Sequence, residues 1–279
     1  MNMSDSGLPP VRLSPELGRV ADLVDRSLAP LAAELPNGLT CRLLRPSDGP
    51  AMRDFRLGVV ERLADPDHYR MAGEVGDFVS EHLGLIGLTA GIFDGNRMAA
   101  YGALTLPDAA GFNRGHDFGL AGAELEHVAH VASAMVDPDY RGLGLHHRLI
   151  DWRLALAGML QRWHLFTTVS PRNHQSWGHL AAHAIYPKRL IQVGNGLMRL
   201  LVHRDLRQRA SIDPEALEVC PVDALSLRRD LFDDGYWVWG RCRMEGRVLA
   251  LLARPRREAP APVPAGQQTA AAPAAVVAA

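Results

Sequence analysis

Apolar residues recur at helical spacing over residues 15–35, so that Val24 and Leu31 share one face of a predicted amphipathic helix. Pro30 lies inside this stretch, and we expect it to kink the helix or to end it early because proline removes a backbone hydrogen bond. We therefore interpret residues 1–37 as a variable helical leader that precedes the main domain.

Strands and helices alternate in the next part of the chain. We predict a strand over residues 39–46, a helix that begins near Pro50, and a less regular helix over about 67–83. The residues Asp-Gly-Asn at 94–96 lie between two apolar runs, which is the pattern of a β-hairpin. Together these elements place the chain in the α/β class.

The middle of the chain contains two buried strands, each followed by a helix. Residues 127–136 carry small or apolar side chains at most positions, as expected for a central strand covered on both faces. The turn at 137–144 leads into an amphipathic helix that begins at Leu145. A further strand at 164–170 leads into a second helix, which we expect to end before Pro187.

The end of the chain repeats a smaller α/β pattern. Two short strands surround a glycine turn at 194–196, and a strand, a helix and a hairpin follow. Beyond about residue 255 the sequence is rich in proline and alanine, which indicates a disordered tail. We therefore divide the chain into a main domain at 38–207, a small C-terminal α/β extension at 208–254 and a tail at 255–279.

The composition is that of an ordinary globular protein, with 47% hydrophobic and 22% charged residues. A formal net charge of −1 argues against a nucleic-acid partner, which calls for an excess of basic residues, and no apolar stretch suggests a membrane partner. The three cysteines are widely spaced, so neither a disulfide framework nor a cysteine zinc site is expected. No secretory signal is visible in the first residues, and we expect a cytoplasmic protein.

The most informative segment runs from Val136 to Leu145 and reads V-D-P-D-Y-R-G-L-G-L, from a buried strand through a turn into a helix. Backbone N–H groups at a helix start point outward unpaired, and the helix dipole favours negative charge there. Glycines allow the backbone to approach a ligand closely, and Arg141 adds a fixed positive charge. We therefore predict a pyrophosphate-binding turn, with a plain structural turn as the alternative. The patterns of a P-loop and of a dinucleotide-binding fold are both absent from the sequence.

The order of these elements, with the motif above and the later N-H-Q-S, resembles the GNAT acetyltransferase superfamily over residues 39–206. The family's pattern is Arg/Gln-x-x-Gly-x-Gly/Ala. Arg141, Gly142 and Gly144 agree with it, whereas His146 occupies the last small position. The resemblance implies a mixed, mostly antiparallel sheet that is flanked by helices and splayed at its central strand.

The resemblance also implies that acetyl-CoA, or another acyl-CoA, binds here as the acyl donor. Its pantetheine arm is expected to pair with main chain at the end of the central strand, and its pyrophosphate with amides of the turn. The family's asparagine on the following helix matches Asn173, for which a helix N-cap is an equal interpretation, and both roles can hold together. The implied cofactor-binding residues are Met135, Val136, Arg141, Gly142, Leu143, Gly144, His146, Asn173 and Ser176.

The reaction requires a base, because the attacking amine must lose a proton. Family members commonly carry a carboxylate on the strand before the motif, and the resemblance places His130 near that position, with Glu126 just before the strand. A histidine titrates near neutral pH, which suits a base, whereas a core histidine and a solvated carboxylate are the structural alternatives. The family's tyrosine acid falls at Leu180, so His179, His183 or Tyr186 is a candidate substitute, and water is a further alternative. These two histidines share a helix face, but no third metal ligand is evident, and no metal site is predicted.

The acceptor is expected to bind between the helical region 48–83 and the glycine-rich loop 107–126. Arg56, Tyr69 and Arg114 are candidates for holding an acceptor carboxylate, with solvated surface as the alternative for each. Less specific candidates in the same regions are Arg53, His68 and His116.

The resemblance implies an enzyme, an acyl-CoA-dependent N-acyltransferase. It would move an acetyl group from acetyl-CoA to the primary amine of a small molecule, such as an amino acid or a natural-product amine. An acetyltransferase for protein N-termini or lysines and a non-catalytic acyl-CoA-binding sensor are the two alternatives. The expected partners are the amine acceptor and, in a homodimer, a second copy of the chain.

Overall fold

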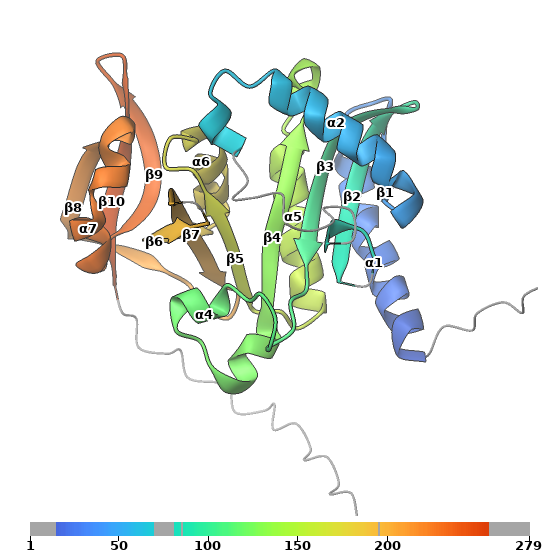
Figure 1. Ribbon diagram of the computed structural model, residues 1–279, viewed down its shortest axis with the longest axis horizontal. Helices are drawn as coiled ribbons and strands as arrows, with labels where there is room; N and C mark the ends of the chain where they lie inside the picture. The colour runs from blue at the N-terminus through green and yellow to red at the C-terminus, as the bar shows by residue number, and fades with distance from the viewer. Residues whose placement is uncertain (1–14, 70–80, 85, 195, 257–279) are drawn as a thin grey trace, which may run out of the picture.

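The computed structural model describes residues 15–69, 81–84, 86–194 and 196–256, with side chains from residue 22 onward. Within these ranges the chain forms a seven-stranded sheet in the order β1-β2-β3-β4-β5-β7-β6 and a three-stranded sheet in the order β8-β10-β9 (Figure 1). Parts of three predictions lie outside the described residues: the start of the leader, most of the helix over 67–83, and the tail after residue 256.

The strands of the large sheet are β1 (Leu39–Leu43), β2 (Gly87–Asp94), β3 (Arg97–Thr105), β4 (Val128–Val136), β5 (His164–Val169), β6 (Tyr186–Val193) and β7 (Leu197–Asp205). The helices are α1 (Pro15–Glu34), α2 (Gly49–Glu61), α4 (Gly115–Phe118), α5 (Leu145–Met159) and α6 (His174–Ala182). Short 3-10 turns are η1 (Pro46–Asp48), η2 (Pro66–Tyr69), η3 (Gly122–His127) and η4 (Pro138–Tyr140). The C-terminal part consists of β8 (Ser211–Pro221), η5 (Val222–Leu227), α7 (Arg229–Asp233), β9 (Trp237–Met244) and β10 (Arg247–Arg256).

Neighbouring strands of the large sheet run antiparallel, except that β4 and β5 are parallel. The predicted fold class is therefore confirmed: a mixed, mostly antiparallel sheet flanked by helices, with a small C-terminal α/β addition. The predicted hairpin also forms, because β2 and β3 pair up to Asp94 opposite Arg97. The limits assigned to the leader, the main domain and the extension stay predictions.

The large sheet opens between its two central strands. The pairing of β4 with β5 ends at His130 opposite Phe166, and beyond that point β4 pairs only with β3 and β5 only with β7. Figure 1 shows the two strands side by side at one end and diverging toward the other. Residues 131–136 of β4 and 167–169 of β5 therefore form two facing edges, which we call the opening.

Helices cover both faces of the large sheet. On one face α1, α5 and α6 contribute to a single core that includes Leu31, Leu149 and Trp177. On the other face α2 packs Met52 against Tyr101 and its neighbours in a second core. Figure 1 shows α1 and α5 behind the sheet and α2 crossing in front of it. The opening thus lies between two helical layers.

Helix α1 runs through Pro30 to Glu34, so the expectation that Pro30 would end it early is wrong. Leu31 is buried directly after the proline, and Trp152 of α5 donates from Nε1 to the Ser27 hydroxyl at 2.9 Å. Packing against α5 offsets the hydrogen bond that the proline removes. Neither α1 nor any other helix in the described part of the chain is both long and apolar enough to cross a membrane.

The boundary of the predicted tail also needs correction. Pro255 was assigned to the tail, but β10 extends to Arg256 and Pro255 lies opposite Ile212 of β8. The register shifts between Ala253 and Pro255, and such an irregularity accommodates a residue that has no N–H to donate.

Candidate functional site

The candidate site is the opening between β4 and β5. Within the described residues, the backbone groups on its two edges have no sheet partner, because each strand pairs only on its other side. Buried backbone N–H and C=O groups are normally hydrogen-bonded, so an extended ligand that carries its own amides can complete the sheet here. The predicted residues Met135 and Val136, buried and half-buried, end the β4 edge.

Charged contacts hold the turn that follows β4. Asp137 is 5% exposed and accepts a hydrogen bond from the Asp139 amide at 3.0 Å. Its carboxylate also pairs with Arg62 at 3.1 Å and with Arg97 at 3.0 Å. Burial raises the pKa of Asp137, but the hydrogen bond and the two arginines outweigh this and leave the pKa below its usual value. The charged carboxylate therefore fixes the direction in which the chain leaves β4.

Two glycines shape the backbone in front of α5. Gly142 and Gly144 have φ angles of +83° and +73°, in the left-handed region that other residues rarely adopt, and Gly144 is the N-cap of α5. The first N–H groups of α5 have no partner inside the helix and carry the positive end of its dipole. Arg141 and Leu143 are exposed beside them. The predicted phosphate-binding residues therefore lie together at the end of the β4 edge.

Arg148 adds a second cation to this turn, which was not predicted from the sequence. Its Nη1 would lie 3.2 Å from a Cβ placed on Gly144, and its Nε donates to the Glu34 carbonyl at 2.6 Å. The signal that could have found it is its position four residues after Gly144, which brings it back over the first turn of the helix.

A β-bulge in β4 reverses which side chains face each helical layer. The register between β3 and β4 shifts between Gly102 and Leu104. Before the shift Val131 belongs to the core beneath α5, and after it Met135 belongs to the core beneath α2. Ser133 is therefore presented on the α2 side of the sheet, directly at the opening.

Three hydroxyl groups meet at this bulge. The Ser133 hydroxyl is hydrogen-bonded to the Tyr101 hydroxyl at 2.7 Å and also to the Tyr69 hydroxyl. Tyr69 was predicted for the acceptor site, whereas Ser133 and Tyr101 were missed because neither belongs to a recognisable motif. Burial raises the pKa of Tyr101 well above its usual value, so this phenol stays neutral.

The turn η2 spans the opening on the α2 side. At one end of the opening the Asp67 carboxylate accepts a hydrogen bond from the Ser170 hydroxyl, just after β5, at 2.9 Å. The His68 carbonyl accepts from Asn173 Nδ2 at 3.2 Å, and Tyr69 reaches the bulge in β4. The same short segment is therefore tied to both strands and to the start of α6.

Asn173 is the N-cap of α6, as one of its two interpretations proposed. Its side-chain oxygen accepts a hydrogen bond from the Ser176 amide at 3.1 Å. The roles of Asn173 and Ser176 toward a cofactor stay predictions.

The three predicted acceptor-binding residues divide between two places. Arg56 is 8% exposed, and its guanidinium carbon lies 5.6 Å from the centroid of the Tyr69 ring. Arg114 lies instead beyond the start of the opening, where its guanidinium pairs with Asp117 at 2.7 Å. Arg56 and Tyr69 therefore form one group at the bulge, and their contact with an acceptor stays a prediction.

His130 lies at the last paired position of β4, next to the opening. Its Nε2 accepts a hydrogen bond from the Arg114 amide at 3.1 Å, which occupies the lone pair of that nitrogen. Burial, with a smaller contribution from the Arg114 charge, lowers the pKa of His130 to about 3. The imidazole is therefore neutral at physiological pH but a weak proton acceptor, closer to the core interpretation than to a general base.

Glu126 is exposed in η3 and is not brought to the opening. It borders a surface depression together with Asp108 and Arg162, and it lies roughly 20 Å along the strand from Ser133. This position agrees with the solvated strand-end interpretation of its carboxylate.

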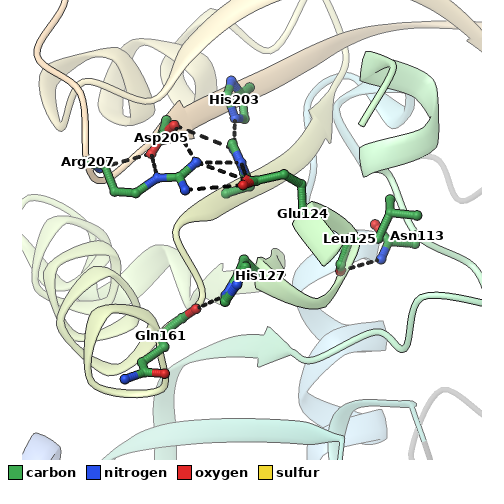
Figure 2. Close-up of polar contacts among 9 residues, drawn as sticks. Asn113, Glu124, Leu125, His127, Gln161, His203, Asp205 and Arg207 are labelled. Atoms are coloured by element: carbon green, nitrogen blue, oxygen red, sulfur yellow. Dashed lines mark hydrogen bonds and ion pairs between the residues drawn. The ribbon is translucent and has the colours of Figure 1, made fainter. Parts of the chain in front are cut away.

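A separate polar network anchors η3 to the sheet near Glu126. The Glu124 carboxylate accepts a hydrogen bond from Arg207 Nη2 at 3.0 Å and is bonded to His164 Nε2 at 2.7 Å. Figure 2 shows Glu124 beside Arg207 and Asp205. Asp205 also binds Arg207 at 3.0 Å, and His127 is hydrogen-bonded to the Gln161 carbonyl, which follows α5 (Figure 2). This network fixes the segment from which β4 begins.

His183 belongs to a histidine cluster between α5 and α6. His146 Nδ1 lies 2.9 Å from His179 Nδ1, and His147 Nδ1 lies 2.8 Å from His183 Nε2. His183 Nδ1 also contacts Asp151 at 2.8 Å. The contacts of His183 are thus directed to α5, and its catalytic role stays a prediction. Within the described residues, no group of three or more His, Cys, Asp or Glu side chains is arranged to hold a metal ion.

We expect the free energy of unfolding to fall as the pH is lowered from about 6.5 to about 4. Burial and neighbouring positive charge lower the pKa of His179 from 6.5 to about 4, and burial also lowers the pKa of His146 and of His183. The unfolded chain binds these protons more readily, so protonation destabilises the fold across this window and not above it. His179 is half-buried, and with solvent screening we expect it to contribute about 2 kcal/mol.

Urea denaturation across the same pH window tests this expectation. His179→Gln should make the pH dependence less steep, since glutamine does not titrate, whereas His146 and His183 still contribute to it. An equally steep dependence in that variant would show that other groups control acid unfolding.

No protein-family model and no curated protein sequence matches the chain. Among solved structures, it is similar to a putative acetyltransferase from Salmonella typhimurium with its cofactor acetyl-CoA, with a TM-score of 0.46 and 15% identity. That match covers 64% of this chain and 99% of the other.

Two further solved structures are similar over a comparable share of the chain. One is an acetyltransferase of the GNAT family from Streptococcus pneumoniae, with a TM-score of 0.44 and 16% identity over 60% of this chain and 99% of that one. The other is Arabidopsis thaliana NAA60 in complex with acetyl-CoA, with a TM-score of 0.48 and 10% identity over 61% and 99%. Sequence identities this low do not indicate that these proteins share any side chain of the candidate site.

Proposed function

We propose that the chain is an acyl-CoA-dependent N-acyltransferase of the GNAT type, which transfers an acyl group, acetyl in the simplest case, to the primary amine of a small molecule. The observation that carries this proposal is the opening between β4 and β5, which ends at the glycine turn before α5. The unpaired backbone of an extended strand edge suits a ligand whose extended chain contains amides. The helix start that follows the edge suits phosphates at one end of that chain. Coenzyme A carries both groups in that order.

The chain's own residues account for binding of such a ligand. Main-chain groups at Met135 and Val136 would pair with the pantetheine amides, and the amides of 141–146 would receive the pyrophosphate. Arg141 and Arg148 bring positive charge to the same turn. Acyl-CoA, when bound, would supply an activated thioester, and the protein would hold this thioester in position and exclude water from it.

The acceptor amine would approach from the α2 side, where η2 spans the opening. The amine nitrogen attacks the thioester carbonyl carbon, the C–N bond forms, the C–S bond breaks and the amine loses a proton. Ser133 stands at this side with its hydroxyl bonded to Tyr69 and Tyr101, so it can hold the amine or a water that takes the proton. His130, on the same side of the sheet, is the weaker candidate because its pKa is about 3.

The covering of this face supports a small acceptor. The tethers of η2 to Ser170 and Asn173 hold it across the opening, which leaves less room for a polypeptide than an open groove would. Acetylation of protein N-termini or lysines is therefore the less favoured alternative. A non-catalytic acyl-CoA sensor would share the binding site but not the turnover.

Titration calorimetry with coenzyme A and acetyl-CoA tests the proposal. We expect binding of both, with dissociation constants of about 1 μM to 1 mM, and release of free thiol from acetyl-CoA when a suitable amine from a panel is added. No heat with either compound would overturn the proposal. Binding without thiol release for any amine would assign the sensor function instead.

A further inference from the structure

Arg153 of α5 is a buried arginine whose charge has no counterpart within the described parts of the chain. It is 1% exposed. Its Nε donates to the Leu149 carbonyl in its own helix at 2.9 Å, and its Nη1 makes a long contact of 3.4 Å to the Ala132 carbonyl. Its Nη2 is enclosed and has no hydrogen-bond partner among the residues that the structure describes.

Among the residues that the structure describes, no carboxylate compensates the charge of this guanidinium. Burial alone lowers the pKa of Arg153 to about 9, and no acidic group in the described part of the chain raises it. His146 lies two turns earlier on α5, and burial together with the Arg153 charge holds its pKa well below the usual value, so it stays neutral. A buried, unpaired charge is costly, and an aliphatic side chain would fill the same space without that cost.

The sheet is adapted to bring this side chain close. Gly102 of β3 lies under α5, and a Cβ placed on it would sit 3.2 Å from the Leu149 Cβ and 3.5 Å from the Arg153 Nε. The missing side chain at Gly102 therefore allows the guanidinium to rest against β3 and β4. Its contact to Ala132 places it at the bulge, beside the β4 edge of the opening.

Arg153 also lies at the depth that an acyl group would reach. Arg153 lies about 14 Å from the N-cap Gly144 along the axis of α5. From Val136 back to Ala132 the strand covers about 13 Å. An extended pantetheine arm spans roughly 15 Å, the reach of a short extended peptide. A thioester anchored by its phosphates at the turn would therefore end beside this guanidinium.

We propose that Arg153 selects an acyl donor whose acyl group ends in a carboxylate, such as a succinyl or malonyl group, over donors with a neutral acyl group. The inference rests on the proposed function and narrows its donor. The N–H groups of Nη1 and Nη2 form a planar fork that matches the two oxygens of a carboxylate, and such charge-assisted pairs are strong in a site closed to water. A carboxylate would supply both the missing hydrogen bonds and the missing negative charge.

Calorimetry on the unmodified protein gives the first test. Succinyl-CoA and butyryl-CoA have carbon chains of equal length and differ in the terminal carboxylate, so their comparison isolates that group. We expect succinyl-CoA or malonyl-CoA to bind at least about tenfold more tightly than butyryl-CoA and acetyl-CoA. Equal affinities for all four would overturn the inference and leave the proposed function intact, whereas no binding of coenzyme A would defeat the proposed function itself.

Two matched variants give the second test. Arg153→Met keeps the length of the side chain but removes its charge, and we expect it to abolish the preference for carboxylated donors while coenzyme A itself binds as before. Arg162→Met is the control, because Arg162 also binds backbone carbonyls, at Pro107 and Val128, but lies at the other end of β4. It should retain the preference.

Other outcomes of the variant test are equally decisive. If Arg153→Met lowered turnover equally with all donors, the role of Arg153 would be to stabilise the leaving thiolate. That result would overturn the inference. If Arg153→Met does not fold, Arg153→Lys takes its place in the test. Lysine keeps the positive charge but lacks the two parallel N–H groups of the guanidinium. This variant should show a reduced preference, and an unchanged preference would contradict a forked contact.

Discussion

Replacing Ser133 with alanine is expected to lower the turnover of amine acylation about a hundredfold, the lower range for loss of a group that assists proton transfer. Ser133 joins the hydroxyls of Tyr69 and Tyr101 at the bulge, on the side from which the amine would approach. Coenzyme A would bind on the main chain and at the turn, so its affinity should change by less than about twofold. Steady-state kinetics and calorimetry on the same samples would separate kcat from binding.

Two further variants make this test specific. Ser133→Thr keeps a hydroxyl and should retain most of the turnover. If Ser133→Ala acted only by disturbing the structure, the threonine variant would not be expected to do so. Tyr69→Phe removes one partner of the Ser133 hydroxyl and should lower kcat by a smaller factor. An unchanged kcat in Ser133→Ala would show that the hydroxyl group takes no part in the reaction. His130 would then be the candidate that assists proton transfer.

Replacing Gly144 with valine is expected to weaken coenzyme A binding by about tenfold to thirtyfold. Gly144 adopts a φ of +73°, which costs a residue with a Cβ roughly 1–2 kcal/mol, and a branched side chain more. A Cβ there would also approach Arg148 Nη1 to 3.2 Å. The turn would relax away from the geometry that presents the first amides of α5, and calorimetry with coenzyme A would measure the loss.

Gly246→Val is the matched control for this substitution. Gly246 has a φ of +78° in the turn between β9 and β10, and a Cβ there would meet nothing within 4 Å. It carries similar backbone strain but lies in the C-terminal sheet, so coenzyme A affinity should not change. Equal losses in both variants would show that general destabilisation, and not the phosphate turn, is responsible.

The parts of the site that could be predicted are those made by consecutive residues. The strand, turn and helix around Arg141 to Gly144 are encoded by local hydrophobic period, by glycines and by the start of an amphipathic run. For the same reason the N-cap role of Asn173 could be proposed, because a cap depends on amides only three residues away.

The catalytic predictions were weaker because they depended on counting along a strand that is not regular. Counting back from the motif led to His130 and Glu126, whereas the bulge in β4 shifts the alternation and presents Ser133 at the opening. A one-residue irregularity reverses which face a side chain occupies, and the sequence carries no clear mark of it.

The sequence by itself determined the order of helices and strands, the hairpin at Gly95 and the glycine turn before α5, since each follows from short-range periodicity and backbone preference. Tertiary structure alone decided that β4 and β5 separate after His130, that Tyr69 meets Ser133, and that Arg153 lies buried beside Ala132. The physical reason is that these contacts join residues far apart in the chain. Their formation depends on how the layers pack, which no local pattern specifies.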